Sequence, residues 1–380
     1  MQTSRRDLFS KSAKIAIGTA IFNSCSPEKS NNFGRTSLEI ENHKNTKNPL
    51  NLKNQANEIN ALNVSNYVPC ITPGIETLPY EMDGNVKVFK LRAEPVTLLF
   101  PDMSDGMGMK MRNINAWGYN GSSPGPTIEC VEGDTVRIVV ENGLAENTTV
   151  HWHGLHIPLA MDGVPGLSQT PIPPGGSFTY EFTLEQHGTY FYHSHVMQAR
   201  QVGLGLMGFF IIHPKNPEPW MIVDKDYAYF LHTWMIHPGS PNPDTMEMSE
   251  FNYFTFNGHT GNNIVPMAAK QGEKVRIRVT NLSMLVHPVH IHGHTARLTE
   301  YGAGFVPPAQ QIPLNTINVS SAEVRVLEFE AKRLGQWLFH CHFVHHTMDD
   351  MHRTPIPGTG GGHAGHQMDS GGMHTHIEIT

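Results

Sequence analysis

The feature that most constrains the fold of this 380-residue chain is an internal repeat. Residues 132–142 read EGDTVRIVVEN and residues 271–281 read QGEKVRIRVTN, and a His-x-His-Gly motif begins nine residues after each segment. The later parts match as well, as GTYFYHSH at 188–195 and GQWLFHCH at 335–342. Both copies alternate apolar and polar residues between Gly, Pro and Asn turns, which is typical of antiparallel sandwich strands. The repeat therefore predicts an all-β chain with two consecutive Greek-key β-sandwiches, at roughly 80–215 and 216–355.

Four His-x-His pairs lie within the two copies. On a strand, such a pair presents both imidazoles to one face, because side chains alternate with a period of two. A single pair is more often a set of packed or surface histidines, but four pairs in the same order in two copies indicate a metal site. Eight imidazoles are enough to hold three copper ions close together. The pairs are His151 and His153, His193 and His195, His290 and His292, and His340 and His342.

The last pair encloses a ligand of a different kind. In His340-Cys341-His342 the cysteine points to the opposite face from its neighbours, so one strand serves two metal sites. Cys341 with His287, His346 and a weak axial Met351 matches the ligand set of a blue-copper centre. The first copy lacks all four of these ligands. The aligned residues are, in order of position, Thr148, Ser194, Ala199 and Leu204.

These clusters resemble those of the multicopper oxidase family, and the match covers most of residues 80–352. The closest resemblance is to two-domain laccase-like members with the blue, or type 1, copper in the second domain. Copper nitrite reductases differ, because they carry that copper in the first domain. The resemblance implies two cupredoxin-like domains and four copper ions per chain. The type 1 ion takes His287, Cys341, His346 and Met351; the type 2 ion takes His151 and His290; the type 3 pair takes His153, His193, His195, His292, His340 and His342.

The resemblance also implies an activity. The type 1 site takes single electrons from a reducing substrate, Cys341 passes them to the adjacent His340 and His342, and the trinuclear cluster reduces dioxygen to water. Asp162 matches the family's proton-supplying aspartate, although a turn-forming Asp-Gly pair is the alternative reading. In two-domain laccases the cluster forms between the first domain of one subunit and the second domain of its neighbour. The resemblance therefore implies a homotrimer whose monomers are inactive.

The N-terminal residues 1–25 are predicted to be an export signal. Arg5-Arg6 precedes an apolar run at 15–22 that is too short to span a membrane. The pattern resembles a twin-arginine signal, with an ordinary secretory signal as the alternative, and predicts a periplasmic or other extracytoplasmic location. Whether Cys25 is lipidated, which would anchor the chain to a membrane, stays open. Residues 26–79 are predicted to form a flexible linker and lead-in, because most of them are polar.

The remaining cysteines and the net charge say less about the fold and the function. Cys70 and Cys130 are free to form a disulfide in an oxidising compartment, or Cys130 is simply a buried apolar residue. The net charge is −7 with no basic stripe, which argues against nucleic acid as a partner.

Two segments are rich in soft metal ligands. One holds Met103, Met107, Met109 and Met111, where packing is the alternative to metal binding. The other is the tail at 356–380, predicted to be flexible and able to capture copper. Its candidate ligands are His363, His366, Met368, Met373, His374 and His376. Three further histidines flank the ligand clusters and are expected to be outer or surface residues: His156, His294 and His345.

Three functions fit these patterns. The first is a laccase-like oxidase of phenols, and the second is a periplasmic cuprous oxidase, suggested by the Met and His/Met segments. The third is a non-catalytic copper carrier, against which the complete ligand set argues. The identity of the electron donor is not readable from the sequence.

Overall fold

The computed structural model describes residues 67–102, 110–302, 304–350 and 371–380. Contacts divide the chain into Met1–Asn63 and Val64–Thr380, and everything below concerns the second unit. The predicted export signal, Cys25 and the linker as far as residue 66 lie outside the described residues. Within the described residues, no helix is long and apolar enough to cross a membrane.

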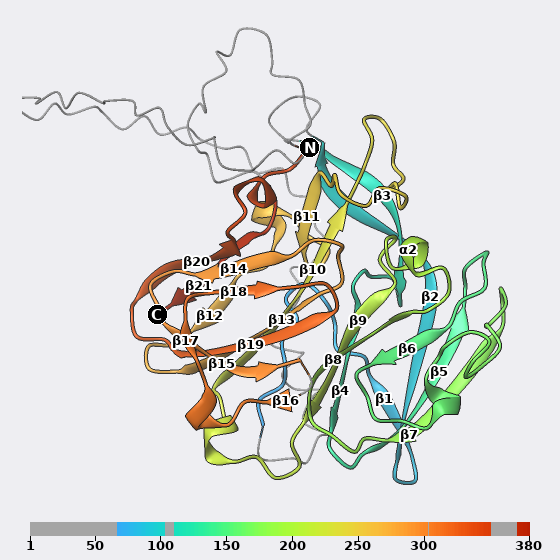
Figure 1. Ribbon diagram of the computed structural model, residues 1–380, viewed down its shortest axis with the longest axis horizontal. Helices are drawn as coiled ribbons and strands as arrows, with labels where there is room; N and C mark the ends of the chain where they lie inside the picture. The colour runs from blue at the N-terminus through green and yellow to red at the C-terminus, as the bar shows by residue number, and fades with distance from the viewer. Residues whose placement is uncertain (1–66, 103–109, 303, 351–370) are drawn as a thin grey trace, which may run out of the picture. The chain divides into compact units, whose positions relative to one another are not determined.

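The N-terminal half confirms the predicted β-sandwich (Figure 1). One sheet has the order β1-β2-β5-β7 with β3 paired to β2, and the other has the order β4-β9-β8-β6. Alternating residues of both sheets, such as Phe89, Ile138 and Phe210, are buried between them. The strands are β1 (Tyr80–Asp83), β2 (Val86–Asp102), β3 (Lys110–Tyr119), β4 (Gly125–Val131), β5 (Thr135–Asn142), β6 (Val150–His153), β7 (Ser177–Thr183), β8 (Gly188–Ser194) and β9 (Met207–His213).

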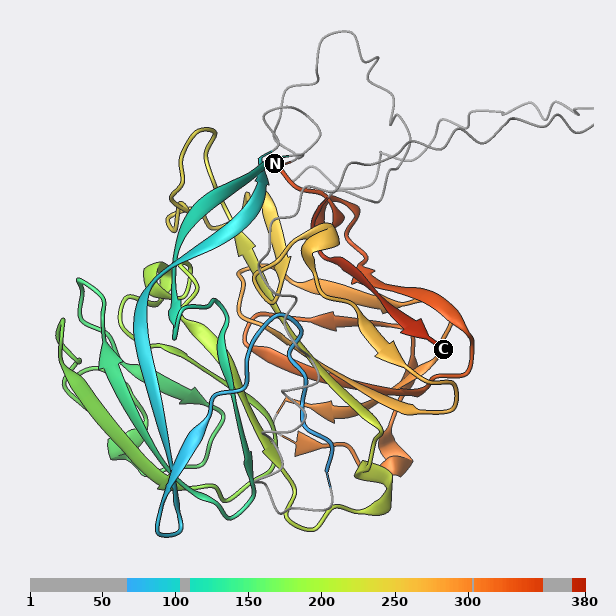
Figure 2. The same cartoon turned by 180° about the vertical axis from the view of Figure 1, so that it is seen from behind.

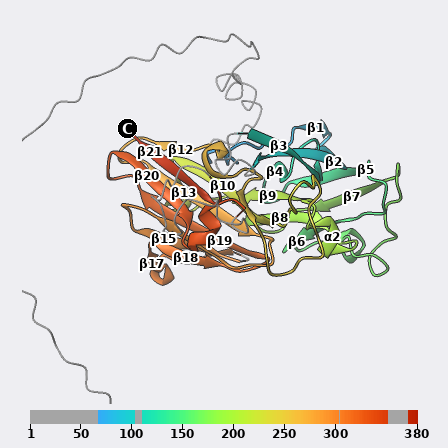
Figure 3. The ribbon, with the colours of Figure 1, turned by 90° about the horizontal axis from the view of Figure 1, so that it is seen from above.

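The C-terminal half repeats the architecture with more strands, and the two sandwiches lie side by side in Figure 3. One sheet has the order β11-β10-β13-β19-β15-β16 with β17 paired to β15, and the other has the order β12-β21-β20-β14-β18. The strands are β10 (Lys225–Trp234), β11 (Tyr253–Phe256), β12 (Met267–Ala269), β13 (Lys274–Asn281), β14 (His287–Ile291), β15 (Ala296–Tyr301), β16 (Gly304–Phe305), β17 (Pro313–Leu314), β18 (Thr316–Val319), β19 (Glu323–Glu330), β20 (Gly335–Cys341) and β21 (His374–Ile379).

The end of the chain corrects one prediction. Residues 371–380 are not part of a flexible tail, because β21 pairs with β20 on one side and with β12 on the other. Met373, Ile377 and Ile379 are buried in the core of the C-terminal sandwich. The Gly, His and Met residues before this strand dominated its composition and hid a short alternating strand pattern. His363, His366 and Met368 lie outside the described residues.

Two apolar seams join the sandwiches. In the first, Phe191 and Phe209 of the N-terminal sandwich pack on Phe230 of β10. In the second, the long β2–β3 hairpin reaches over the other sandwich, as Figure 2 shows, where Phe100 packs on Trp234 and neighbouring residues. The first seam holds the N-terminal sheet that carries the first histidines against the C-terminal sandwich, and the second seam holds the other N-terminal sheet there.

A buried polar network crosses between the sandwiches as well. Glu300 on β15 accepts hydrogen bonds from the backbone N–H and the hydroxyl of Thr189 on β8, at 2.5 and 2.9 Å. Arg278 on β13 donates to the same hydroxyl at 2.5 Å and pairs with Asp226 at 2.7 Å. Because every charged member is buried and partnered, the network fixes β8, the strand that carries His193 at its end.

The lead-in packs on the folded unit. Cys70 is buried at the seam with Phe191 and Phe230, and Cys130 is buried in the N-terminal core. Both cysteines are free thiols, so the disulfide that the sequence left open does not form here.

Candidate metal centre

Three donors of the predicted type 1 site converge in the C-terminal sandwich. His287 begins β14, Cys341 ends β20, and His346 lies on the short helix η7 (Val344–Thr347) that follows. The Cys341 Sγ atom lies 3.3 Å from His346 Nδ1 and 3.9 Å from His287 Nδ1, and the two Nδ1 atoms are 3.0 Å apart. Met351, the predicted axial ligand, lies outside the described residues.

The chemistry of these donors fits copper. Burial raises the pKa of the Cys341 thiol to about 12 and lowers the pKa of His346 to about 3. Because the neighbouring imidazoles are neutral, the buried Cys341 thiol becomes a thiolate only when a cation is bound beside it. The Nε2 atom of His287 bonds to Ser283 Oγ at 2.9 Å, which turns Nδ1 toward the sulfur. A His₂Cys set of this kind is the blue-copper ligand set.

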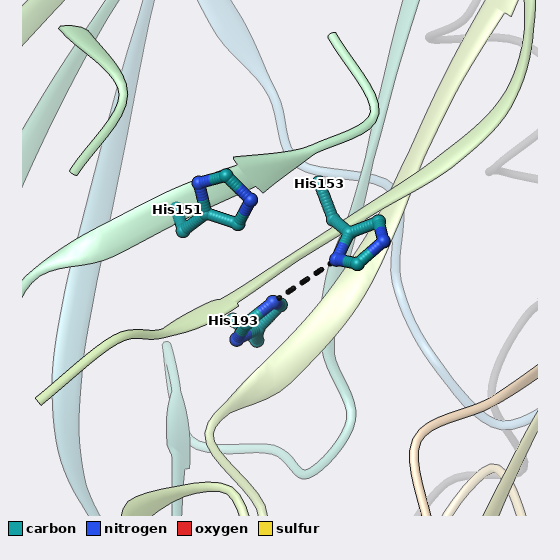
Figure 4. A group of neighbouring side chains, drawn as sticks. All are labelled: His151, His153 and His193. Atoms are coloured by element: carbon teal, nitrogen blue, oxygen red, sulfur yellow. Dashed lines mark hydrogen bonds between the residues drawn. The ribbon is translucent and has the colours of Figure 1, made fainter. Parts of the chain in front are cut away.

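The first half of the trinuclear set lies on β6 and β8 of the N-terminal sandwich (Figure 4). Opposite pairing of His151 and His193 across the two strands brings their imidazoles together, and His153 Nδ1 lies 3.4 Å from His193 Nε2. His195 follows the end of β8, with its ring centroid 5.4 Å from that of His151. Burial lowers the pKa of His193 to about 3 and that of His153 to about 4. Their lone pairs are therefore available to a metal at neutral pH.

Backbone oxygens orient these rings. His151 donates from Nδ1 to the Asp162 carbonyl at 2.7 Å, and His193 donates from Nδ1 to the Ser194 carbonyl at 2.8 Å. Each hydrogen bond leaves Nε2 to face the cluster, which is the usual arrangement of a metal-binding histidine.

The second half of the set repeats this geometry on β14 and β20. His290 pairs opposite His340, and His292 Nε2 lies 3.0 Å from His340 Nε2. The ring of His342 lies 5.5 Å from that of His290. His290 donates from Nδ1 to the Asn315 carbonyl at 2.7 Å, and His340 donates to the Cys341 carbonyl at 2.8 Å. Both halves thus present Nε2 atoms from paired strands.

The two halves do not meet within the chain. Ring contacts and hydrogen bonds join the histidines within each set, and among the described residues none joins one set to the other. The N-terminal set instead lines a cavity of about 560 Å³, whose lining also includes His232, Met248 and Met284 of the C-terminal sandwich. A complete three-copper site therefore needs histidines from outside this cavity.

Asp162 lies beside the first half-site. It follows the short helix η3 (Leu159–Met161), and its carboxylate Oδ1 is 3.4 Å from His151 Nδ1. Its carbonyl orients the same ring. Asp162 therefore lies in a turn, as the alternative reading of the sequence predicts, and its carboxylate also lies next to a predicted ligand.

The residues behind the first half-site differ from the predicted type 1 ligands that lie at the aligned positions of the other copy. Thr148, aligned with His287, hydrogen-bonds to Ser194 Oγ at 3.3 Å and to Gln201 Oε1 at 2.9 Å. Ser194, aligned with Cys341, also bonds to Gln201. All three are fully buried, so a closed hydrogen-bonded set occupies the positions that hold His287 and Cys341 in the other copy.

Sequence reasoning missed the residues that support the ligands. These residues are Gln201, Ser283 and Asn315. Folding brings each of them to a cluster, and no sequence motif identifies them. Of the three histidines predicted to be outer or surface residues, His156 and His345 are exposed and His294 hydrogen-bonds to the His292 carbonyl at 3.1 Å.

Comparison with family models matches two parts of the chain, each to a model described as "Multicopper oxidase". The matched residues are 106–217 and 235–356. Each match contains one pair of histidine clusters, and the second also contains the Cys341 set.

Two of the curated relatives each match over less than half of this chain. A segment of 161 residues is 38% identical to "Copper resistance protein A" of Pseudomonas syringae pv. tomato, covering 42% of this chain and 26% of that protein. A segment of 164 residues is 40% identical to "Laccase-1" of Cryptococcus neoformans var. neoformans serotype D (strain B-3501A), covering 42% of this chain and 24% of that protein. The matched part is thus about a quarter of either relative's length.

Solved structures match more of the chain. The blue copper oxidase from Nitrosomonas europaea superposes with a TM-score of 0.65 at 29% identity, covering 77% of this chain and 85% of that one. The multicopper oxidase mgLAC superposes with a TM-score of 0.64 at 31% identity, covering 77% and 86%. Both confirm the cupredoxin-like fold.

Proposed function

This chain belongs to the multicopper oxidase family, and we propose that it couples one-electron oxidation of a phenolic substrate, in the laccase-like manner, to reduction of dioxygen to water. The observation that carries the proposal is the sharing of β20 by two donor sets. Cys341 faces His287 and His346 on one side of the strand, while His340 contacts His292 on the other. Copper bound at these residues, four ions per chain, would supply the electron transfer and the dioxygen chemistry.

The chain's own residues prepare both sites. Burial keeps the imidazoles of His346 and His193 neutral, so neither ring has to lose a proton before a metal binds. Backbone carbonyls hold the rings of His151, His193 and His340 in fixed orientations. Cys341 is joined through the backbone to His340 and His342, which supports a covalent route for electrons between the two donor sets. Asp162, next to His151, is the proposed proton donor for dioxygen reduction.

The trinuclear site is proposed to form between copies of the chain. The N-terminal histidines face a cavity rather than the C-terminal set, which supports completion of the site by a neighbour's His290, His292, His340 and His342. A heterologous contact of this kind closes into a ring, and we propose a homotrimer.

A specific observation favours cuprous ion as a second candidate donor. Described residues that flank the two soft-ligand segments are hydrogen-bonded to His346 itself or to a strand that contacts it. Tyr253 donates to the Pro101 carbonyl at 3.0 Å, next to Phe254, whose ring stacks on His346 at 4.2 Å. The Met373 backbone N–H donates to the His346 carbonyl at 2.8 Å. Two relatives, from Pseudomonas syringae and Escherichia coli, bear the name copper resistance protein A.

The location belongs to the same proposal. The twin-arginine-like start supports export of a folded, copper-loaded protein to the periplasm or another extracytoplasmic space, with Cys25 as a candidate site for a lipid anchor. No basic stripe is present in the sequence to support a nucleic-acid partner.

A donor profile of the copper-loaded protein tests the function. We expect a blue absorption band, about four copper ions per chain and oxygen uptake with 2,6-dimethoxyphenol. Deleting residues 356–368, which spares β21, should leave phenol turnover unchanged; a loss confined to Cu(I) turnover would favour the cuprous oxidase. Copper binding without any oxygen uptake would refute both oxidases and support the carrier.

A further inference from the structure

The three described type 1 donors, His287, Cys341 and His346, are closed off from solvent, and their axial partner is not yet assigned. A His₂Cys centre usually has a weak thioether ligand from methionine at the axial position. Such a ligand has to be buried with the other donors. Among the described residues of the C-terminal sandwich, two methionines are buried, Met267 and Met373.

Met373 lies opposite Cys341 in the sheet. Strand β21 runs antiparallel beside β20 (Figure 1), and His374 is the partner of His340. The pairing continues by one residue, because the Cys341 backbone N–H donates to the Met373 carbonyl at 3.0 Å. Opposite residues of an antiparallel pair share one face of the sheet, with Cβ atoms about 5 Å apart. The Met373 side chain is therefore on the face of the Cys341 sulfur, and His340 is on the other.

The burial pattern of β21 supports this orientation. Met373, Ile377 and Ile379 are buried in the same core cluster as Cys341, whereas Glu378 is exposed. Because side chains alternate along a strand, the odd-numbered residues of this segment face the core. The Met373 thioether is thus enclosed on the side of the sheet where the type 1 donors converge.

The backbone around Met373 is also fitted to His346. The Met373 N–H donates to the His346 carbonyl at 2.8 Å, and the Gly372 carbonyl accepts from the Gly261 N–H at 2.8 Å. Gly372 has a φ of +71°, and a Cβ at this position would overlap the His346 carbonyl. Glycine is therefore needed here for the chain to approach so closely. Backbone contacts to Cys341 and His346 together fix Met373 beside two of the type 1 donors.

The other described methionines of this region do not meet the requirement. Met267 on β12 is the partner of Ile377, four residues along β21 from Met373. Since a strand rises about 3.3 Å per residue, Met267 is displaced from Met373 by roughly 13 Å along the sheet. Met348 follows His346 closely in the sequence, but its side chain is 48% exposed. Met373 is thus the described methionine that is both buried and next to Cys341.

We propose that Met373 supplies the axial thioether of the type 1 site, in place of Met351, the residue that the spacing from Cys341 predicts. This inference rests on the proposed copper-oxidase function. Met351 lies outside the described residues, whereas Met373 is held against Cys341 and His346 by the hydrogen bonds of β21. The axial ligand tunes the reduction potential of a blue-copper centre. Met373 therefore sets the potential at which the site accepts an electron.

Two variants of the copper-loaded full chain test this role through the type 1 reduction potential, measured by redox titration of the blue absorption. Met373→Leu keeps the buried volume, so it should fold and bind copper, but it has no donor atom. We expect its potential to rise, because the cupric form loses a ligand. Met373→Gln offers an oxygen donor that favours the cupric form more strongly, so its potential should fall. A side chain that only packs in the core would not shift the potential in opposite directions.

Two matched variants serve as controls. Met267→Leu makes the same change at a buried methionine of the same core, away from Cys341. Met351→Leu makes it at the residue that the sequence spacing predicts. Both should keep the wild-type potential and the wild-type electron paramagnetic resonance spectrum of the blue copper.

The possible results separate this inference from the proposed function. A raised potential in Met351→Leu, together with a wild-type potential in Met373→Leu, assigns the axial position to Met351 and overturns the inference. Wild-type potentials in both Met373→Leu and Met351→Leu overturn it as well, because neither thioether is then a ligand. Copper binding by the wild type without a blue band refutes the proposed copper centre itself.

Discussion

The two sandwiches carry the same histidine scaffold and differ in what lies behind it. Behind β8, Thr148, Ser194 and Gln201 satisfy one another's hydrogen bonds in a buried cluster. Behind β20, His287, Cys341 and His346 converge with nitrogens and sulfur facing one another. The comparison teaches that the paired His-x-His strands are a common frame, and that the residues on the opposite face differ: a closed hydrogen-bonded cluster in one copy and a set of candidate metal donors in the other.

Converting the C-terminal pattern into the N-terminal one should have the largest effect. In Cys341→Ser the hydroxyl that replaces the thiol is not a blue-copper ligand. We expect loss of the blue band, loss of one copper ion per chain and no oxidation of phenol, measured by absorption, copper analysis and oxygen uptake. A variant that keeps its blue band would contradict the assignment of Cys341.

Asp162 and Asn315 both orient a histidine through a backbone carbonyl, but only the Asp162 side chain is an acid. His151 and His290 are both oriented by backbone carbonyls, yet among the described residues an ion pair with a carboxylate, at 3.4 Å, is found for His151 and not for His290. Asp162→Asn keeps the carbonyl and removes the acid, so we expect oxygen reduction to slow by about 100-fold.

The control for Asp162→Asn is the anaerobic reduction of the blue band by phenol, which should be as fast as in the wild type. Oxygen uptake at the wild-type rate would leave Asp162 with only its turn role.

Both sandwiches should lose stability in acid when copper is absent. Burial holds the pKa of His193 and of His346 at about 3 in the folded chain, below the ordinary value of 6.5. The unfolded chain therefore binds more protons between these values. Stability is full above pH 6.5 and falls, by on the order of a few kcal/mol, as the pH drops toward 3.

Thermal unfolding of the copper-free protein from pH 7 to pH 4 measures this loss. His193→Gln and His346→Gln should each flatten the slope, which separates the contributions of the two sandwiches. A melting temperature that does not change with pH would contradict the depressed pKa values.

Opening the N-terminal polar cluster should have a smaller effect. Gln201→Leu removes the partner of Thr148 and Ser194, and we expect a loss of about 1–3 kcal/mol in unfolding free energy because two buried hydroxyls lose a hydrogen bond. Copper content and blue absorption should not change. A loss of copper in this variant would show that the cluster supports the metal ligands as well as the fold.

The grouping of the candidate ligands was predictable from the sequence because their pattern is local. A strand alternates its faces whatever surrounds it, so the alternation alone assigns His151 with His153 to one face, and Cys341 to the face opposite His340 and His342. The repeat likewise predicted two sandwiches, and the sheets of both halves confirm them.

Contacts between distant segments were not predictable. Asn315 reaches His290 across the β14–β18 pair, and Ser283 reaches His287 across a turn. Strand β21 was missed because its short alternating pattern follows a Gly- and His-rich stretch. Its position in the sheet depends on pairing with β20, which the sequence does not reveal. The closure of His346 from solvent also depends on rings from two elements, β11 and η7.

A complementation experiment tests most directly whether one trinuclear site is built from two copies. One variant carries His153→Ala and His193→Ala, and the other carries His292→Ala and His340→Ala, so each is expected to be inactive alone. Co-expressed in one assembly, the first contributes an intact C-terminal half-site and the second an intact N-terminal half-site. The account predicts that oxygen uptake returns in the mixed trimer; a mixed assembly of wild-type size that stays inactive would contradict it.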